Sequence, residues 1–126
     1  MRVFKTKWFV RYALKAHIDD NSLKETVERA ERGLVDAELG GYIIKMRIAR
    51  KGQGRSSGYR TLIAYRRNQR AVFLFGFAKN ERENIDDDEL LSLKEIAAAW
   101  LTVNDQVLNR SISDGLLQEV NYDKET

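Results

Sequence analysis

The chain has 126 residues, of which 43% are hydrophobic and 33% are charged, and it carries a formal net charge of +3 with one histidine and no cysteine. This composition excludes disulfides, thiolate metal ligands and cysteine nucleophiles, so we expect no metal and no cofactor. No run of 18 apolar residues and no secretion signal is present, which favours a cytoplasmic protein over a membrane-bound or secreted one.

The first third of the chain predicts two helices. Apolar side chains recur at helical spacing over residues 8–16, and the polar run at residues 19–21 is expected to end this first helix. Ser22 and Glu25 have the spacing of a capping box, so we expect them to open a second helix that stops at Gly33.

From residue 41 the hydrophobic period changes to two, which predicts β-strands. A strand over residues 43–49 is expected to bury Ile44, Met46 and Ile48 and to present Lys45 and Arg47 together on its other face. Further strands are expected over three segments, which are residues 3–6 at an edge of the sheet, residues 59–66, and residues 71–77 at its centre. Three of these strands should be adjacent and antiparallel.

The last third of the chain predicts a helix and a tail. Three aspartates at residues 86–88 precede apolar residues at helical spacing over residues 90–101, and we interpret the aspartates as a helix cap rather than a functional cluster. Residues 104–120 are expected to be weakly helical, with Ser113 and Asp114 as caps and with no assigned chemistry.

These elements predict an α+β fold. We expect a small antiparallel sheet with two N-terminal helices packed on one face and a further C-terminal helix. A chain of this length buries one ordinary core, so residues 1–126 should form a single domain in which residues 102–126 are a C-terminal extension.

The positive charge is concentrated in the middle of the chain. Residues 42–82 hold 11 basic side chains and 1 acidic side chain, whereas residues 83–126 hold 3 basic and 11 acidic ones. Such a segment attracts polyphosphate and adds salt-sensitive affinity for nucleic acid. The alternative is a solvated basic surface that has no partner.

The same segment carries a recognisable series of motifs. LGGYIIKMRIARKGQGRSSGYRTLIAYRR followed by AVFLFGFAKNERENI contains a K-x-R strand, a glycine-rich basic loop, GYR and GFAKNER in this order. In this combination the chain resembles the RelE/HigB-type toxins of bacterial type II toxin-antitoxin systems over about residues 1–101. The DGLLQEV stretch of the tail is also similar to one subgroup.

The resemblance implies an activity and its partners. It implies a RelE-like fold and a ribosome-dependent endoribonuclease, or mRNA interferase, that cuts mRNA in the ribosomal A site without a metal and so inhibits translation. It also implies a cognate antitoxin from the same operon. We expect that antitoxin to be acidic or to be a helix-turn-helix protein, and to cover the basic face or displace the last helix.

Five cationic residues are the candidates for catalysis. Metal-free RNA cleavage by the 2′-hydroxyl needs a proton acceptor, stabilisation of a dianionic phosphorane and protonation of the leaving oxygen. Arg60 in the GYR motif is our first choice for gripping the phosphoryl oxygens, with Arg47 and Arg82 assisting. Lys45 and Lys79 are the candidates for proton transfer, because neighbouring cations favour the neutral form of a lysine.

A second group of residues is expected to bind RNA. Arg50, Lys51 and Arg55 lie in the basic loop and should contact backbone phosphate. Tyr59 and Tyr65 could stack on a base or relay a proton, although strand tyrosines at alternating positions are more often packed in a core. Tyr42 leaves the same two alternatives open.

Two positions depart from the family pattern. The best-known members carry a further arginine and a tyrosine around and after the third strand, where Asn80 and Asp86 stand here. Arg82, Glu81 or Asp86 could replace the missing functions. The single histidine, His17, is interpreted as a surface residue.

Two rival functions remain open. A ParE-like toxin of the same fold would poison DNA gyrase and cut nothing, although the K-x-R and GYR pattern favours the ribonuclease. A non-enzymatic RNA-binding or ribosome-associated module would use the same cations for affinity alone.

Overall fold

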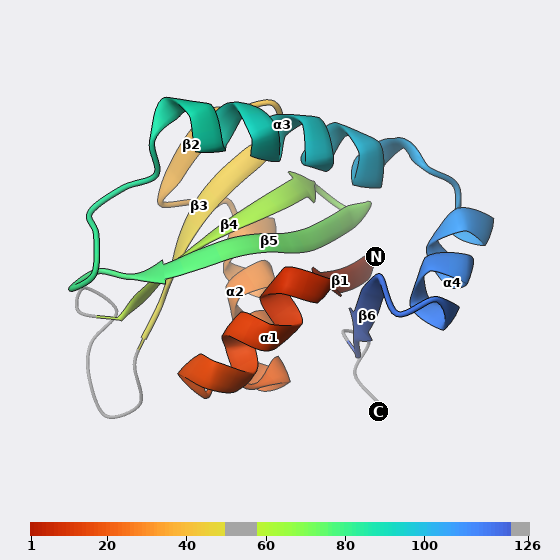
Figure 1. Ribbon diagram of the computed structural model, residues 1–126, viewed down its shortest axis with the longest axis horizontal. Helices are drawn as coiled ribbons and strands as arrows, with labels where there is room; N and C mark the ends of the chain where they lie inside the picture. The colour runs from red at the N-terminus through yellow and green to blue at the C-terminus, as the bar shows by residue number, and fades with distance from the viewer. Residues whose placement is uncertain (50–57, 122–126) are drawn as a thin grey trace.

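The computed structural model describes residues 1–49 and 58–121, which form a mixed sheet of six strands with helices on both faces (Figure 1). The strands in sequence are β1 (Arg2–Thr6), β2 (Ala37–Gly40), β3 (Ile43–Ile48), β4 (Tyr59–Arg66), β5 (Arg70–Ala78) and β6 (Leu117–Val120). The helices are α1 (Lys7–Ala16), α2 (Asp20–Glu31), α3 (Asp87–Thr102) and α4 (Asp105–Ser113). The strands are arranged in the order β2-β3-β4-β5-β1-β6.

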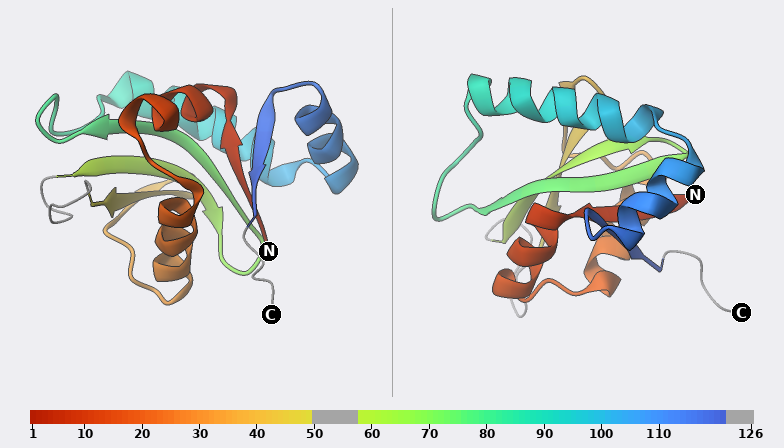
Figure 2. Two further views of the ribbon diagram at one scale, coloured as in Figure 1. Left: turned by 90° about the horizontal axis from the view of Figure 1, so that it is seen from below. Right: turned by 45° about the vertical axis from the view of Figure 1, so that its right-hand side comes forward.

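The predicted α+β class is confirmed. Helices α1 and α2 pack on one face of the sheet, as expected, and α3 crosses the other face (Figures 1 and 2). Each face buries its own apolar layer, because strand side chains alternate between the two sides. The α1–α2 layer contains Phe9, Leu23, Met46, Ile63 and Phe73 among others. The opposite layer contains Phe4, Leu62, Val72, Ala97 and Leu108 among others.

The three central strands follow the predicted alternation. Strands β3, β4 and β5 are adjacent and antiparallel, and Ile44, Met46 and Ile48 are buried on the α1–α2 side. Ile43, which alternation assigned to the exposed set, is also buried, because it belongs to the apolar layer beneath α3. On the α3 side of β3, the apolar layer therefore includes Ile43 but not the next two side chains on that face, Lys45 and Arg47.

Residues 3–6 form a strand as expected, but the expected position of this strand at an edge of the sheet is wrong. Strand β1 lies inside the sheet, where it pairs parallel with β5 and antiparallel with β6. The tail supplies the strand that covers β1: residues 117–120 form β6, whereas helix was expected there. Residues 105–113 are helical as expected, with Asn104 as the N-cap and Asp114 as the C-cap. Strand β2 was not predicted.

The helix ends correct one predicted cap and confirm another. Asp19, not Ser22, caps α2, and its side chain accepts a hydrogen bond from the Ser22 backbone N–H at 2.9 Å. Helix α1 ends at Ala16, and His17 follows in the left-handed conformation with φ of 58°. Asp86 caps α3 through a capping box with Glu89, as the aspartate run predicted. None of the helices in the described part of the chain is long and apolar enough to span a membrane.

A close approach between α1 and β5 generates a prediction about Gly76. A Cβ added at Gly76 would lie 2.6 Å from a ring carbon of Tyr12, and that ring is held by stacking on Trp8 at 5.3 Å. Gly76→Ala should therefore destabilise the fold by about 1–3 kcal/mol, as overpacking of a filled core does. Urea unfolding measures this loss. The double variant Gly76→Ala with Tyr12→Leu should lose less than the sum of the two single variants, and strict additivity would contradict the contact.

Candidate active site

The pairing of β3 with β4 brings the predicted cations together. Arg47 lies directly opposite Arg60 in the antiparallel register, and Lys45 precedes Arg47 by two residues on the same face of β3. Lys79 follows the end of β5, the other neighbour of β4. The four side chains line one pocket of about 290 Å³, together with Asp36, Ala37 and Glu83. The structure thus brings together four of the five residues that were predicted to be catalytic.

Side chains from α2 and the α2–β2 connection hold the backbone of Arg47. Strand β2 begins at residue 37, so the ladder does not reach the outward-pointing N–H and C=O of Arg47. Asp36 Oδ2 accepts a hydrogen bond from the Arg47 N–H at 2.7 Å, and Arg29 Nη2 donates to the Arg47 carbonyl at 2.6 Å. Both backbone groups are therefore satisfied, and the end of β3 is fixed in place.

The cations differ in their exposure to solvent. Arg60 is buried, with 8% of its surface exposed, whereas Arg47 and Lys79 are exposed and Lys45 is half-buried. A guanidinium in such a position makes stronger interactions with an anion than one in open water, because the local dielectric is lower. The pocket is therefore suited to a phosphoryl group that enters from solvent and meets Arg60 at its base.

Arg82 does not line this pocket. Its guanidinium forms a two-pronged ion pair with Glu89 at 2.6 and 3.2 Å, and it donates to the carbonyl of Asn84 at 2.8 Å. The hydrogen bond with Glu89 raises the pKa of Arg82, and the same bond is the main cause of a lowered pKa for Glu89. Arg82 thus ties the loop after β5 to the first turn of α3.

Tyr59 and Tyr65 lie on the opposite face of the sheet from Arg60. The hydroxyl of Tyr59 donates to the carbonyl of Ala16 at 3.2 Å, and the hydroxyl of Tyr65 donates to Glu31. Both rings pack against the α1–α2 layer. The structure therefore does not bring these two tyrosines to the cationic pocket.

The other predicted RNA-binding residues, Arg50, Lys51 and Arg55, lie outside the described residues. Of the residues proposed as replacements, Asp86 caps α3, and Glu81 accepts a hydrogen bond from the Ala78 N–H at 3.3 Å. Neither residue lines the pocket.

Sequence reasoning missed the two carboxylates of the pocket. Asp36 accepts the hydrogen bond from the Arg47 N–H, whereas Glu83 is an exposed side chain that lines the same pocket as Lys79 and Arg60. The available signal was the position of Glu83 four residues after Lys79, directly behind the GFAKNER motif. The pocket therefore offers a carboxylate as well as amines for proton transfer.

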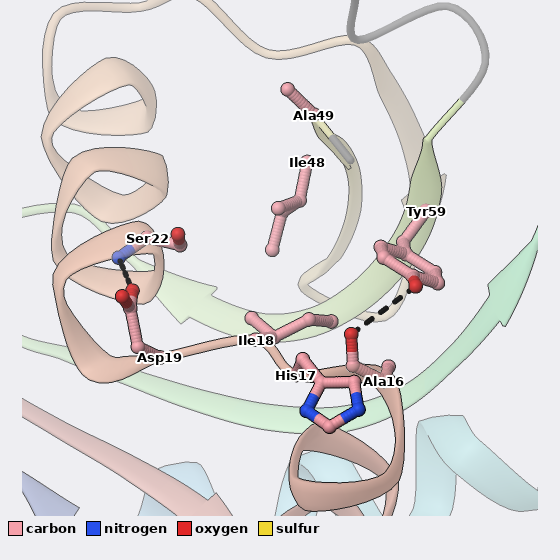
Figure 3. Close-up of a pocket in the computed structure, with 8 residues that line it drawn as sticks. All are labelled: Ala16, His17, Ile18, Asp19, Ser22, Ile48, Ala49 and Tyr59. Carbon is pink, nitrogen blue, oxygen red and sulfur yellow. Dashed lines mark hydrogen bonds between the residues drawn. The ribbon is translucent and has the colours of Figure 1, made fainter. Parts of the chain in front are cut away.

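A larger cavity of about 770 Å³ lies at the α1–α2 junction (Figure 3). None of the eight described residues that line it is lysine or arginine, and Asp19 is occupied in capping α2. His17 lines its rim and is exposed, as a surface histidine should be. Four cations line the smaller pocket on the other face of the sheet, so we place the candidate site there.

The ion pair of Arg82 generates a prediction about pH. Because the pKa of Glu89 is lowered in the folded state, its stabilising contribution is present above the pKa of the unfolded chain, about 4.3, and is lost as the pH falls through the folded-state value. Glu89→Gln should lower the melting temperature at neutral pH, and the deficit should shrink below about pH 4. Thermal unfolding followed by circular dichroism measures both effects. Glu95→Gln on α3 is the control, and a deficit that does not change with pH would contradict the ion-pair assignment.

Comparison with known proteins identifies the family. The family model described as the RelE toxin of the RelE/RelB toxin-antitoxin system matches residues 1–120, which include the cationic pocket, α4 and β6. A search of curated proteins finds no significant match. The match to the family model extends over nearly the whole chain, and the chain therefore belongs to the RelE toxin family.

Proposed function

We propose that this RelE-family toxin is a ribosome-dependent endoribonuclease and that the pocket between β3 and β4 binds the scissile phosphate of mRNA. The observation that carries the proposal is the pairing of Arg47 with Arg60 in one pocket with Lys45 and Lys79. Like charges placed directly opposite each other on neighbouring strands destabilise a sheet. A bound phosphate would relieve that repulsion.

The chemistry starts with attack of the 2′-hydroxyl on the adjacent phosphorus. The bond to the 5′-oxygen then breaks, leaving a cyclic phosphate and a free 5′-hydroxyl. Negative charge builds on the phosphoryl oxygens in between, where the planar guanidinium of Arg60 can hold two of them and Arg47 can assist from the opposite strand. Neither arginine can transfer the proton, because a guanidinium does not deprotonate in proteins.

Proton transfer falls to the other pocket residues. Lys45 and Lys79 were the sequence candidates, and Glu83 adds a carboxylate to the lining of the same pocket. We assign Glu83 as the acceptor of the 2′-hydroxyl proton and Lys79 or Lys45 as the donor to the leaving 5′-oxygen. Arg82 is assigned a positioning role, since its ion pair with Glu89 fixes the loop that carries Lys79 and Glu83.

The ribosome is the proposed source of substrate alignment. Attack must occur in line with the leaving oxygen, and we assign none of the described residues that line the pocket to orient the ribose. Holding reacting groups in line can lower a barrier by as much as roughly 7–11 kcal/mol. mRNA held in the A site would supply this alignment, so free RNA should be a poor substrate. The basic residues Arg50, Lys51 and Arg55 are proposed to contact RNA.

The remaining partner is an antitoxin. RelE-type toxins are silenced by the product of a neighbouring gene, and an acidic or helix-turn-helix antitoxin would be attracted to the basic face. If the chain is of the HigB type, its antitoxin is expected to be the helix-turn-helix protein. Co-purification from the native operon would identify the antitoxin. A ParE-like gyrase poison is the alternative function, and assays of gyrase supercoiling with the purified toxin distinguish it.

Substitution of Arg60 tests the proposal. Arg60→Ala should reduce cleavage of mRNA in a translation reaction by roughly a hundred- to a thousandfold, as loss of one preorganised donor to a developing oxyanion does. Mapping of the 3′ ends of the message measures cleavage. Arg60→Lys, which keeps the charge but loses the two-pronged geometry, should remain strongly impaired. Absence of new 3′ ends with the folded wild-type protein would refute the ribonuclease assignment.

Substitution of Glu83 tests the proton acceptor. Glu83→Gln should slow single-turnover cleavage on the ribosome by at least about a hundredfold, because a general base contributes this much or more. Its affinity for the ribosome should change little. Glu95→Gln removes the same charge from the exposed side of α3 and should cleave at the wild-type rate. If both variants cleave at the wild-type rate, the proton acceptor is not Glu83.

A further inference from the structure

An exposed tyrosine stands at the β2–β3 turn, about 17 Å along β3 from Arg47 at the usual strand rise. Gly41 and Tyr42 form this two-residue turn with φ of 59° and 64°. Turns of this kind favour glycine and asparagine, because a larger side chain at positive φ is strained. Tyr42 is nevertheless 61% exposed, so burial of its ring does not explain the choice of residue.

One cation of the β4–β5 hairpin lies against this ring, and a second follows it in the chain. The guanidinium carbon of Arg66 lies 4.8 Å from the centroid of the Tyr42 ring, and the exposed Arg67 follows it in the chain. The backbone N–H of Tyr65 donates to the Tyr42 carbonyl at 2.8 Å, which fixes the turn beside β4. Within residues 1–49 and 58–121, neither Arg66 nor Arg67 has a carboxylate at ion-pair distance.

We infer that Tyr42, Arg66 and Arg67 form a second RNA-binding site, in which the tyrosine ring stacks on an unpaired base and the arginines contact the flanking phosphates. Proteins bind single-stranded nucleic acid by this combination of aromatic stacking and backbone cations. The base would stack on the face of the ring that Arg66 does not cover. The choice of RNA as ligand rests on the proposed function, but the site is separate from the cationic pocket.

The ring favours RNA over an acidic protein segment as the occupant. Arginines alone would attract either ligand, since both are polyanions. An unpaired base also has a flat apolar face to offer, whereas a chain of carboxylates does not. A tyrosine kept in a strained and exposed position is therefore accounted for by a base and not by an acidic peptide.

The test is binding of a fluorescein-labelled 2′-O-methyl RNA oligonucleotide, which lacks the free hydroxyl needed for cleavage, followed by fluorescence anisotropy. Tyr42→Asn should weaken binding by about fivefold to a hundredfold, which is the usual loss for one stacked base. The same variant should melt at or above the wild-type temperature, because asparagine tolerates positive φ better than tyrosine. The Tyr42→Asn variant and the wild type should bind an abasic strand with the same backbone equally well.

Arg67→Ala and Arg110→Ala form the matched pair of charge variants. Arg67→Ala should weaken binding of both the normal and the abasic strand and reduce the slope of log affinity against log salt by about 0.7. Arg110→Ala removes an exposed cation from α4 and should leave the binding of both strands and the salt slope unchanged.

Three results would overturn the inference. They are wild-type RNA affinity of Tyr42→Asn, a fall in its melting temperature like that of a core substitution, and Tyr42-dependent binding of poly-glutamate in place of RNA. Binding is measured without cleavage, so a failure here leaves the proposed nuclease intact. A wild-type protein that binds RNA through Tyr42 but cuts no message would instead refute the nuclease alone.

Discussion

The register between β3 and β4 is the constraint on which the candidate site depends. It sets Arg47 against Arg60, two like charges whose repulsion opposes the pairing. The repulsion is tolerated because Ile44 and Met46 are anchored in the core on the other face of β3. A slip of one residue would exchange the two faces and drive the cations into the core. Apolar burial on one side of the strand therefore holds the charges together on the other.

The two faces of the sheet separate the packed tyrosines of β4 from the candidate site. On the α1–α2 side, Tyr59 and Tyr65 pack against the apolar layer, and their hydroxyls donate hydrogen bonds to the Ala16 carbonyl and to Glu31. On the α3 side, the apolar layer stops short of the β3–β4 end, where Arg60 lies at the base of an open pocket. Alternation along β4 explains why neighbouring residues of the GYR motif lie in these different environments.

The sequence predicted the elements that have a strong period and missed those that depend on distant partners. Periodicity identified α1, α3 and the three central strands, because each buries enough apolar surface to impose its own pattern. The position of β1 could not be predicted in this way, since its two neighbours, β5 and β6, come from residues about 70 and 115 positions later in the chain. Strand β2, with four residues, has too short a pattern to be recognised.

The same distinction applies to the candidate site. Lys45, Arg47 and Arg60 could be predicted to converge, because alternation and antiparallel order suffice to place them on one face. The role of Arg82 could not, because its partner Glu89 reaches it only when α3 begins at residue 87. Asp36 and Glu83 enter the pocket from connections between elements, where no period indicates the direction of a side chain. Predictions for Arg50, Lys51 and Arg55 remain predictions.

The charge asymmetry of the sequence is partly cancelled in the folded chain. Arg82 pairs with Glu89, and Arg70 lies 3.5 Å from Asp105 while donating to the carbonyls of Trp100 and Val103 at the end of α3. Both carboxylates come from the acidic last third of the chain, so part of that acidity serves to dock α3 and α4 on the sheet. Lys45, Arg47, Arg60 and Lys79 line the pocket at one end of the β3–β4 pair, and Arg66 and Arg67 follow one another at the other end. A count of charges along the sequence thus overstates the positive charge that is left unneutralised in the folded chain.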